Sequence, residues 1–228
     1  MSTPRLQLHH LSHQWATTPA SSPLFTLDDL QLNSGDSLFM CGPSGCGKST
    51  LLNIITGLLP PTQGEVLING QSLYGLKPGA RDRLRAQCMG VITQSLNLLP
   101  YLTVAENLRL MQTFSAQKAD SEWQRHLLQT LNLTAQAHQP VEQLSIGQQQ
   151  RAAIARALIH KPSLIIADEP TTALDDDNKN AFMSLLLNEM QNFDTALLMV
   201  SHDTRLQPHF SRTLDLRQYQ SAEADYVS

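Results

Sequence analysis

The sequence predicts an α/β fold built on a mainly parallel sheet. Two short strands that are apolar at every position, Leu164–Ala167 and Ala196–Val200, are separated by a helical pattern over Asn178–Phe193. Another strand, Ser37–Cys41, leads through a glycine-rich turn into a helical pattern over Thr50–Leu59. Strands that alternate with helices are joined by right-handed crossovers and therefore lie parallel. Continuously apolar strands are typical of a sheet with both faces covered.

Size and composition indicate a globular protein. The chain has 228 residues, which suits one large α/β domain or two very small ones. Its 41% apolar and 16% charged residues argue against disorder. The net charge is -4 and no block of Lys or Arg occurs, so a nucleic-acid partner has no electrostatic support.

Residues 1–13 lack the apolar core of a signal peptide, and no segment approaches the ~18 consecutive apolar residues of a membrane span. The three cysteines fit no zinc spacing and suit a reducing compartment. We therefore expect a cytosolic protein, or one that reaches a membrane only through a partner.

Local patterns predict the remaining elements in order. The first third of the chain is rich in strand signals, among them Glu65–Ile68, and Thr17–Pro23 predicts a hairpin loop. The middle is helical: Thr103-Val-Ala-Glu106 has the spacing of a capping box, and Asp120 could cap a second helix that runs through Leu133. A further helix is predicted over Gln148–His160.

The loop after Ser37–Cys41 matches the phosphate-binding pattern G-x-x-x-x-G-K-S/T. Glycines let backbone N–H groups turn toward phosphates, and the N-terminus of the following helix adds partial positive charge. Lys48 is expected to reach the β- and γ-phosphates, and the Ser49 hydroxyl to ligate Mg²⁺. The alternative, a chance match in a glycine-rich turn, is disfavoured by the flanking strand and helix. The residues expected to contact nucleotide here are Gly42, Pro43, Ser44, Gly45, Cys46, Gly47, Lys48, Ser49 and Thr50.

Two carboxylates follow the apolar strand Leu164–Ala167. Asp168 comes at the C-terminal end of a parallel strand, where such sheets bind ligands, and would hold Mg²⁺ directly or through water. Glu169 could direct the water that attacks the γ-phosphate, and general-base assistance of this kind is worth ~10²–10⁴ in rate. A solvated loop residue is the alternative for Glu169. Together with the phosphate loop, the pair predicts an NTPase.

Another motif narrows the choice among NTPases. Residues 144–151, LSIGQQQR, closely resemble the signature peptide of ABC ATPases, usually written LSGGQ. The resemblance runs from about Leu6 to Leu216, nearly the whole chain. Other family elements occur in the family's order: Trp15 in LSHQW, Gln94 in VITQS, LIIADEP over 164–170, Ala173-Leu174-Asp175, and Ser201-His202-Asp203.

The resemblance implies the ABC ATPase version of the P-loop NTPase fold. That fold has a mainly parallel, RecA-like core sheet, an N-terminal antiparallel β-subdomain and an α-helical signature subdomain. We expect residues 1–228 to form a single domain, in which approximately 1–93 and 160–228 make the catalytic core with the β-subdomain and 94–159 the helical subdomain. The cofactors would be ATP and Mg²⁺.

The resemblance also implies roles for residues of this chain. In the family, two copies enclose two ATP molecules head to tail, and each signature contacts the γ-phosphate held by the other copy. The catalytic residues would be Lys48, Glu169 and His202. The metal ligands would be Ser49, Gln94 and Asp168. The nucleotide contacts outside the phosphate loop would be Trp15, which stacks on adenine, Gln94, Ser145, Gly147, Gln148 and Asp175.

Each of these roles has a simpler alternative. Gln94 could be a surface-loop glutamine, and His202 a hydrogen-bonded histidine at a strand end. Trp15 could cover a sheet edge instead of stacking on adenine. Asp176 and Asp177 are interpreted as an acidic cap of the following helix.

Several positions carry chain-specific hypotheses. Ile146 replaces the first glycine of the signature pair, and a β-branched residue is costly there if the position needs a positive φ or a close backbone approach. Gly147 is kept, so we expect ATPase activity to survive. Thr172 stands where the bacterial group of lipoprotein-release, macrolide-export and cell-division ABC ATPases usually has glycine. Cys46 lies near a helix N-terminus, where a thiolate is favoured, and is hypothesised to be alkylated readily unless ATP protects it.

The segment from Gln94 to Asn107 resembles a bacterial group of lipoprotein-release, macrolide-export and cell-division ATPases. We therefore expect an ATP-hydrolysing subunit that forms a homodimer when ATP is bound. It would power export, lipid or lipoprotein extraction, or force transmission by integral membrane permease subunits, from the cytoplasmic face of the inner (plasma) membrane. The alternative is a soluble ABC ATPase that acts on nucleic acid or ribosomes. The single cassette and acidic balance disfavour it, and no direct nucleic-acid contact is expected.

Overall fold

The computed structural model describes residues 3–15, 23–172, 174, 176–190 and 193–220. The chain divides into two compact units, Met1–Arg85 with Ala196–Ser228, and Ala86–Thr195. Helix α2 (Pro78–Cys88) contains the boundary between them. Most of the predicted hairpin loop over 17–23 lies outside the described residues.

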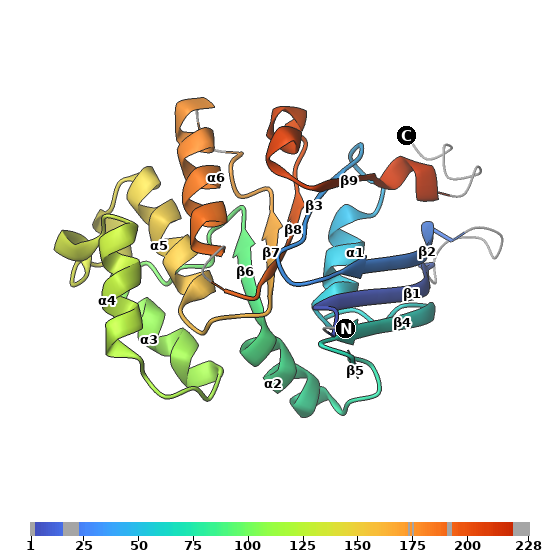
Figure 1. The fold of residues 1–228 in the computed structure, drawn as a ribbon, viewed down its shortest axis with the longest axis horizontal. Helices are drawn as coiled ribbons and strands as arrows, with labels where there is room; N and C mark the ends of the chain where they lie inside the picture. The colour runs from blue at the N-terminus through green and yellow to red at the C-terminus, as the bar shows by residue number, and fades with distance from the viewer. Residues whose placement is uncertain (1–2, 16–22, 173, 175, 191–192, 221–228) are drawn as a thin grey trace. The chain divides into compact units, whose positions relative to one another are not determined.

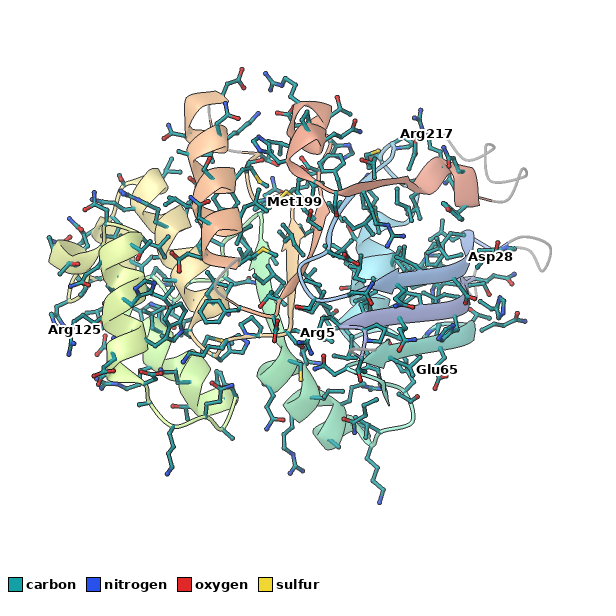
Figure 2. All side chains as sticks on the ribbon, in the orientation of Figure 1. Arg5, Asp28, Glu65, Arg125, Met199 and Arg217 are labelled. Atoms are coloured by element: carbon teal, nitrogen blue, oxygen red, sulfur yellow. The ribbon has the colours of Figure 1, made fainter. Side chains whose placement is uncertain are left out.

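The first unit contains an antiparallel sheet with the strand order β2-β1-β4-β5 (Figure 1). Along β2 the apolar residues are buried and the polar ones exposed, the pattern of a sheet with one solvated face. The charged side chains of Asp28 in β2 and Glu65 in β4 lie on the exposed side (Figure 2). The sheet confirms the expected N-terminal antiparallel subdomain. Its strands are β1 (Leu6–His13), β2 (Phe25–Leu32), β4 (Gln63–Ile68) and β5 (Gln71–Ser72).

The first unit also contains parallel strands. Strand β3 (Ser37–Cys41) pairs in parallel with both β8 (Ala196–Val200) and β9 (Arg212–Asp215). The interior of β3 and all of β8 are buried, including Met199 (Figure 2). Two 3₁₀ helices complete the unit, η3 (Thr204–His209) and η4 (Leu216–Tyr219).

Helix α1 (Lys48–Ile55) is shorter than the predicted helix over 50–59. It starts two residues earlier, directly after the phosphate loop. It ends earlier because Gly57 adopts a left-handed conformation with φ 77°. The Gly57 N–H then donates to the Ile54 carbonyl at 3.1 Å, and the Leu58 N–H to the Asn53 carbonyl at 2.8 Å. These bonds satisfy carbonyls at the helix end, as glycine-terminated helices commonly do.

The second unit pairs β6 (Met89–Thr93) in parallel with β7 (Leu164–Asp168). With the parallel strands of the first unit, this confirms the predicted mainly parallel core. The helices are α3 (Val104–Phe114), α4 (Ser121–Thr130), α5 (Ile146–Leu158) and α6 (Asp176–Met190), with the 3₁₀ helices η1 (Thr134–Gln136) and η2 (Val141–Gln143) (Figure 1). None of the helices in the described residues is both long enough and apolar enough to cross a membrane.

The predicted helix caps are present in the second unit. Thr103 and Glu106 form the capping box of α3, with Thr103 N–H and Glu106 Oε2 2.8 Å apart. Asp120 Oδ1 accepts from the Trp123 N–H at 2.9 Å at the start of α4, whose outer face carries the exposed Arg125 (Figure 2). Helix α4 stops at Thr130, three residues short of the prediction.

Candidate active site

The phosphate loop connects β3 to α1 in the first unit. Gly47 takes a left-handed conformation with φ 99° at the N-cap position of α1, which favours glycine. Gly42 allows close approach, because a Cβ there would lie 2.6 Å from Cys46 Sγ. In the first intrahelical hydrogen bond of α1, the Leu51 N–H donates to the Gly47 carbonyl at 2.8 Å. The N–H groups of the first turn therefore extend beyond the helix end, the arrangement that binds phosphate.

Lys48 is buried within the loop, with 8% of its surface exposed. Its Nζ donates to the carbonyl oxygens of Gly42 and Pro43, each at 2.8 Å, and lies 4.0 Å from Cys46 Sγ. A buried ammonium needs such partners. Because the ammonium has three N–H donors and sulfur is a weak acceptor, a phosphate oxygen is a better partner for the third donor than Cys46.

Cys46 does not fit the hypothesis of ready alkylation. Its side chain is 1% exposed, and its Sγ packs against Gly42. A reagent therefore cannot reach the sulfur unless the phosphate loop opens. Cys46 fills space inside the loop. Its burial limits its reactivity even though it lies near a helix N-terminus.

The loop that contains His202 begins beside the phosphate loop. Met40 in β3 pairs with Val200 in β8, and the Ser201 N–H donates to the Met40 carbonyl at 3.2 Å. Because the two strands are parallel, the residues after both lie at one edge of the sheet. His202 is exposed there. The structure thus places His202 and the phosphate loop at the ends of two neighbouring strands, β8 and β3.

Trp15 is linked to the phosphate loop through the antiparallel sheet. A Cβ on Gly47 would lie 3.0 Å from the side chains of Leu24 and Phe25. Phe25 pairs with His13, two residues before Trp15. The His13 and Trp15 rings meet edge to face with centroids 4.9 Å apart, and Trp15 remains 45% exposed. Burial lowers the pKa of His13, so a neutral ring supports the tryptophan. The Trp15 ring is held in place by His13 and is partly exposed, which suits stacking on a nucleotide base.

The second unit brings the other polar residues to the ends of β6 and β7. Thr93 in β6 is the register partner of Asp168 in β7. Gln94 and Glu169 each follow one residue later, at the same edge of this strand pair. An amide oxygen and carboxylates are the donors that Mg²⁺ prefers. In the described residues no group of three or more His, Cys, Asp or Glu could hold a metal by itself. Mg²⁺ needs none, because it keeps waters and substrate phosphates as ligands.

Glu169 has an unusual backbone. Its φ is 49°, in the left-handed region that non-glycine residues rarely occupy. Such conformations cost on the order of 1–3 kcal/mol and cluster at functional sites. The Thr172 hydroxyl lies 3.2 Å from both the Glu169 carbonyl oxygen and Oε2 of its carboxylate. Glu169 is therefore held by a turn of the chain and is not simply a solvated loop residue.

The signature forms the start of α5, which begins two residues before the predicted start at Gln148. Ser145 is the N-cap: its Oγ accepts from the Gln148 N–H at 3.3 Å, and Gln148 Oε1 accepts from the Ser145 N–H at 2.9 Å. This capping box was missed by the sequence analysis, although the spacing S-x-x-Q predicts one. A hydroxyl that accepts still has its proton to donate, so Ser145 can also bond a phosphate oxygen.

Ile146 occupies the first helical position of α5, and its φ is not positive. Its side chain is 59% exposed. The first condition that would make isoleucine costly, a positive φ, is therefore not met, and within the single chain the side chain has room. A Cβ on Gly147 would meet no atom within 4 Å. Gly147 also lines a small pocket of about 240 Å³ between α5 and α6.

Two further expectations concern the start of α6. Asp175 and Ala173 lie outside the described residues. Asp176 and Asp177 are the first residues of α6, two residues before its predicted start at Asn178. A carboxylate in a first turn is favoured by the helix dipole, which agrees with the interpretation of Asp176 as part of an acidic cap, while the side chain of Asp177 lies outside the described part of the chain.

Comparison with known proteins gives the same picture over most of the chain. The family model for ABC transporters matches residues 26–172. The lipoprotein-releasing system ATP-binding protein LolD of Psychrobacter arcticus is 41% identical over 201 residues, which cover 86% of this chain and 88% of that protein. The LolD of Hydrogenovibrio crunogenus is 37% identical over 100% of this chain and 97% of its own length.

Solved structures agree. A dimeric ATP-binding cassette in a post-hydrolysis state, bound to ADP and Pi, superimposes with a TM-score of 0.80 at 32% identity, over 92% of this chain and 93% of that one. The predicted ABC ATPase fold and the resemblance to the lipoprotein-release group are therefore confirmed. The chain belongs to the ABC transporter family, as an ATP-binding and ATP-hydrolysing subunit.

Proposed function

We propose that the chain binds ATP with Mg²⁺, pairs with a second copy while ATP is bound, and drives integral membrane permease subunits that export or extract a lipid-linked substrate. The observation that carries the chemistry is the register of β6 and β7, because the pairing of Thr93 with Asp168 sets Gln94 and Glu169 at adjacent strand ends. Similarity to lipoprotein-releasing ATP-binding proteins supports the transport class.

Within this proposal the phosphate loop holds the phosphates, and Lys48 neutralises their charge. The ligands of Mg²⁺ are Ser49, Gln94 and Asp168, and the ion supplies charge neutralisation on the phosphates. Glu169 accepts a proton from the attacking water, and His202 orients the γ-phosphate and that water. Trp15 stacks on adenine. The second copy contributes Ser145, Gly147, Gln148 and Asp175. As predicted, residues 1–93 and 160–228 would form the core and 94–159 the helical subdomain.

The permease partners place the chain, in this proposal, on the cytoplasmic face of the inner membrane. The dimeric state of the solved relative supports the pairing of two copies. Pairing explains why the signature carries polar groups at a solvent-accessible helix start, since Ser145 is exposed and Gln148 is half-buried. A helix N-terminus of this kind stabilises a phosphate presented by another molecule.

A tagged Glu169→Gln variant tests the proposal. Its ATP turnover should fall by about 10²–10⁴, because glutamine cannot accept the proton of the attacking water. ATP should then hold the two copies together. Purified with ATP from gently solubilised native membranes, this variant should bring a stoichiometric integral membrane protein, identified by mass spectrometry.

A tagged Lys48→Ala variant is the matched control, since it should lose ATP affinity and fail to form the ATP-held pair. Recovery of ribosomes, nucleic acid or soluble proteins alone would remove the transport assignment and favour the soluble ABC ATPase. Unchanged turnover in Glu169→Gln would remove the proposed base.

A further inference from the structure

The turn that follows β7 joins two residues, Glu169 and Thr172. Glu169 leaves the strand with φ 49°, so its backbone turns sharply away from the strand direction. The Thr172 N–H lies 3.4 Å from the Glu169 carbonyl oxygen, and the Thr172 hydroxyl lies 3.2 Å from the same oxygen. The turn is thus closed by both the backbone and the side chain of Thr172.

The same hydroxyl also reaches the Glu169 side chain. Thr172 Oγ1 lies 3.2 Å from Oε2 of the carboxylate. A hydroxyl has a single proton, so it is shared between, or alternates between, the backbone carbonyl and the carboxylate. Hydrogen bonds to an ionised carboxylate are stronger than bonds to a neutral carbonyl, which favours the side-chain partner. Thr172 therefore restricts the rotation of the carboxylate that Glu169 extends from the strand end.

We propose that Thr172 is a positioning residue for ATP hydrolysis, whose hydroxyl fixes the Glu169 carboxylate in the orientation that accepts a proton from the attacking water. The inference rests on the proposed role of Glu169 as the base. A carboxylate has two oxygens with about four acceptor positions, so a donor at Oε2 does not use up the capacity of Oε1. Orientation matters because a base must lie within hydrogen-bond reach of the proton that it takes.

Thr172 assists the transfer of the γ-phosphoryl group of ATP to water. One O–H bond of water breaks, and its proton passes to the Glu169 carboxylate. The water oxygen forms a bond to the γ-phosphorus, and the bond from that phosphorus to the β,γ-bridging oxygen breaks. Its electron pair stays on ADP, and inorganic phosphate is released. Thr172 takes part in none of these bond changes; it contacts the Glu169 carboxylate and acts through it.

Two substitutions separate the hydroxyl from the shape of the side chain. Thr172→Val keeps the β-branched outline but removes the donor, while Thr172→Ser keeps the donor. The kcat of Thr172→Val should fall about tenfold, as expected when a hydrogen bond to a charged group is lost, with KM changed less than about twofold. Thr172→Ser should restore kcat to within about twofold of the unsubstituted chain. The dissociation constant of ATP should be unchanged in both variants, and the melting temperature of Thr172→Val should fall by no more than about 4 °C, as expected for the loss of a single hydrogen bond.

A double-variant cycle shows whether Thr172 acts through Glu169. In the Glu169→Gln background, measured by single turnover, Thr172→Val should cause no further loss, because residues that act as a unit are not additive. The inference is overturned if Thr172→Val keeps full kcat, if Thr172→Ser loses as much as valine, or if the tenfold loss persists beside Glu169→Gln. If Glu169→Gln itself keeps full turnover, the proposed base fails and the inference fails with it.

Discussion

At the residue scale, the backbone of the phosphate loop binds the ammonium group of the loop's own lysine, Lys48. Lys48 is almost fully buried, and two carbonyl oxygens compensate the loss of water around its ammonium. The Cys46 Sγ lies 4.0 Å from the Lys48 Nζ and fills space against Gly42. When phosphate binds, one of its oxygens can therefore accept from the Lys48 ammonium, which is already held in place, with little rearrangement of the loop.

Ile146 provides a test at this scale. Since its φ is not positive and its side chain is 59% exposed, replacing it with glycine relieves no strain. We expect Ile146→Gly to change ATP turnover by less than tenfold, measured as steady-state phosphate release. Gly147→Ile is the contrasting variant, because it would add a β-branched side chain beside the pocket between α5 and α6. A gain above tenfold in Ile146→Gly would mean that isoleucine impairs the signature.

The positions of single residues in the fold were largely predictable, whereas their environment was not. The loop predicted from its spacing lies between β3 and α1, and Asp168 and Glu169 lie at the end of β7, as expected. The left-handed backbone of Glu169 has no sequence signal, because glutamate rarely adopts it and only the surrounding fold enforces it. Cys46 was misjudged because a helix N-terminus is visible in sequence and burial is not.

At the scale of elements, the helix starts follow capping chemistry. Each of α3, α4 and α5 begins after a residue whose side-chain oxygen accepts a backbone N–H. The caps of α3 and α4 were predictable from the spacing of Thr103 and Glu106 and from Asp120. Helix ends were predicted less well: α1 stops before a left-handed glycine, Gly57, and α4 stops where Asn132 takes φ 53°. Glycine and asparagine adopt this conformation more readily than other residues, so both ends carried a local signal that the predicted helix bounds did not use.

The cap of α3 gives a prediction for this scale. Thr103→Ala removes the oxygen that accepts the Glu106 N–H, and loss of an N-cap typically lowers the free energy of unfolding by about 1 kcal/mol. Urea unfolding should show this as a lower midpoint with an unchanged slope.

Thr113→Ala is the control on the same helix. Thr113 is exposed and its hydroxyl bonds back to the Arg109 carbonyl at 3.0 Å, an arrangement that adds no stability to a helix. Its midpoint should stay the same or rise. An equal loss in both variants would contradict the role of Thr103 as a cap.

At the scale of the whole molecule, the class of fold followed from the alternation of strands and helices, because strands joined by helices lie parallel and solidly apolar strands are typical of a sheet with both faces covered. Local patterns predicted the strands of the antiparallel subdomain less completely than those of the parallel core. Strand β2 was not predicted, since its Asp28-Asp29 pair breaks the apolar alternation. It is nevertheless a strand because β1 supplies backbone partners for seven of its eight residues, all but Asp28. Tertiary pairing prevails over local propensity at such positions.

Stability of the whole chain should depend on pH through a buried histidine. His160 is 0% exposed, and its Nε2 lies 2.9 Å from the Met89 carbonyl oxygen. Burial lowers its pKa below the ordinary 6.5, and the charge of Arg156 acts in the same direction. The folded chain therefore binds fewer protons than the unfolded chain below pH 6.5. Stability contributed by neutral His160 is complete above that pH and is lost as the pH falls from 6.5 toward the folded-state pKa.

Urea unfolding between pH 7.5 and 5.5 measures this dependence. The carboxylates with lowered pKa values, Glu106, Asp120 and Asp215, have ordinary values of 4.5 and 3.8, so they stay ionised across the window. The midpoint should fall on acidification. His160→Gln, which can still donate to the Met89 carbonyl, should show a smaller fall. The pKa of His13 is lowered too, but both chains share it, so the difference between them reports His160. Equal falls in the two chains would show that His160 does not couple folding to protonation.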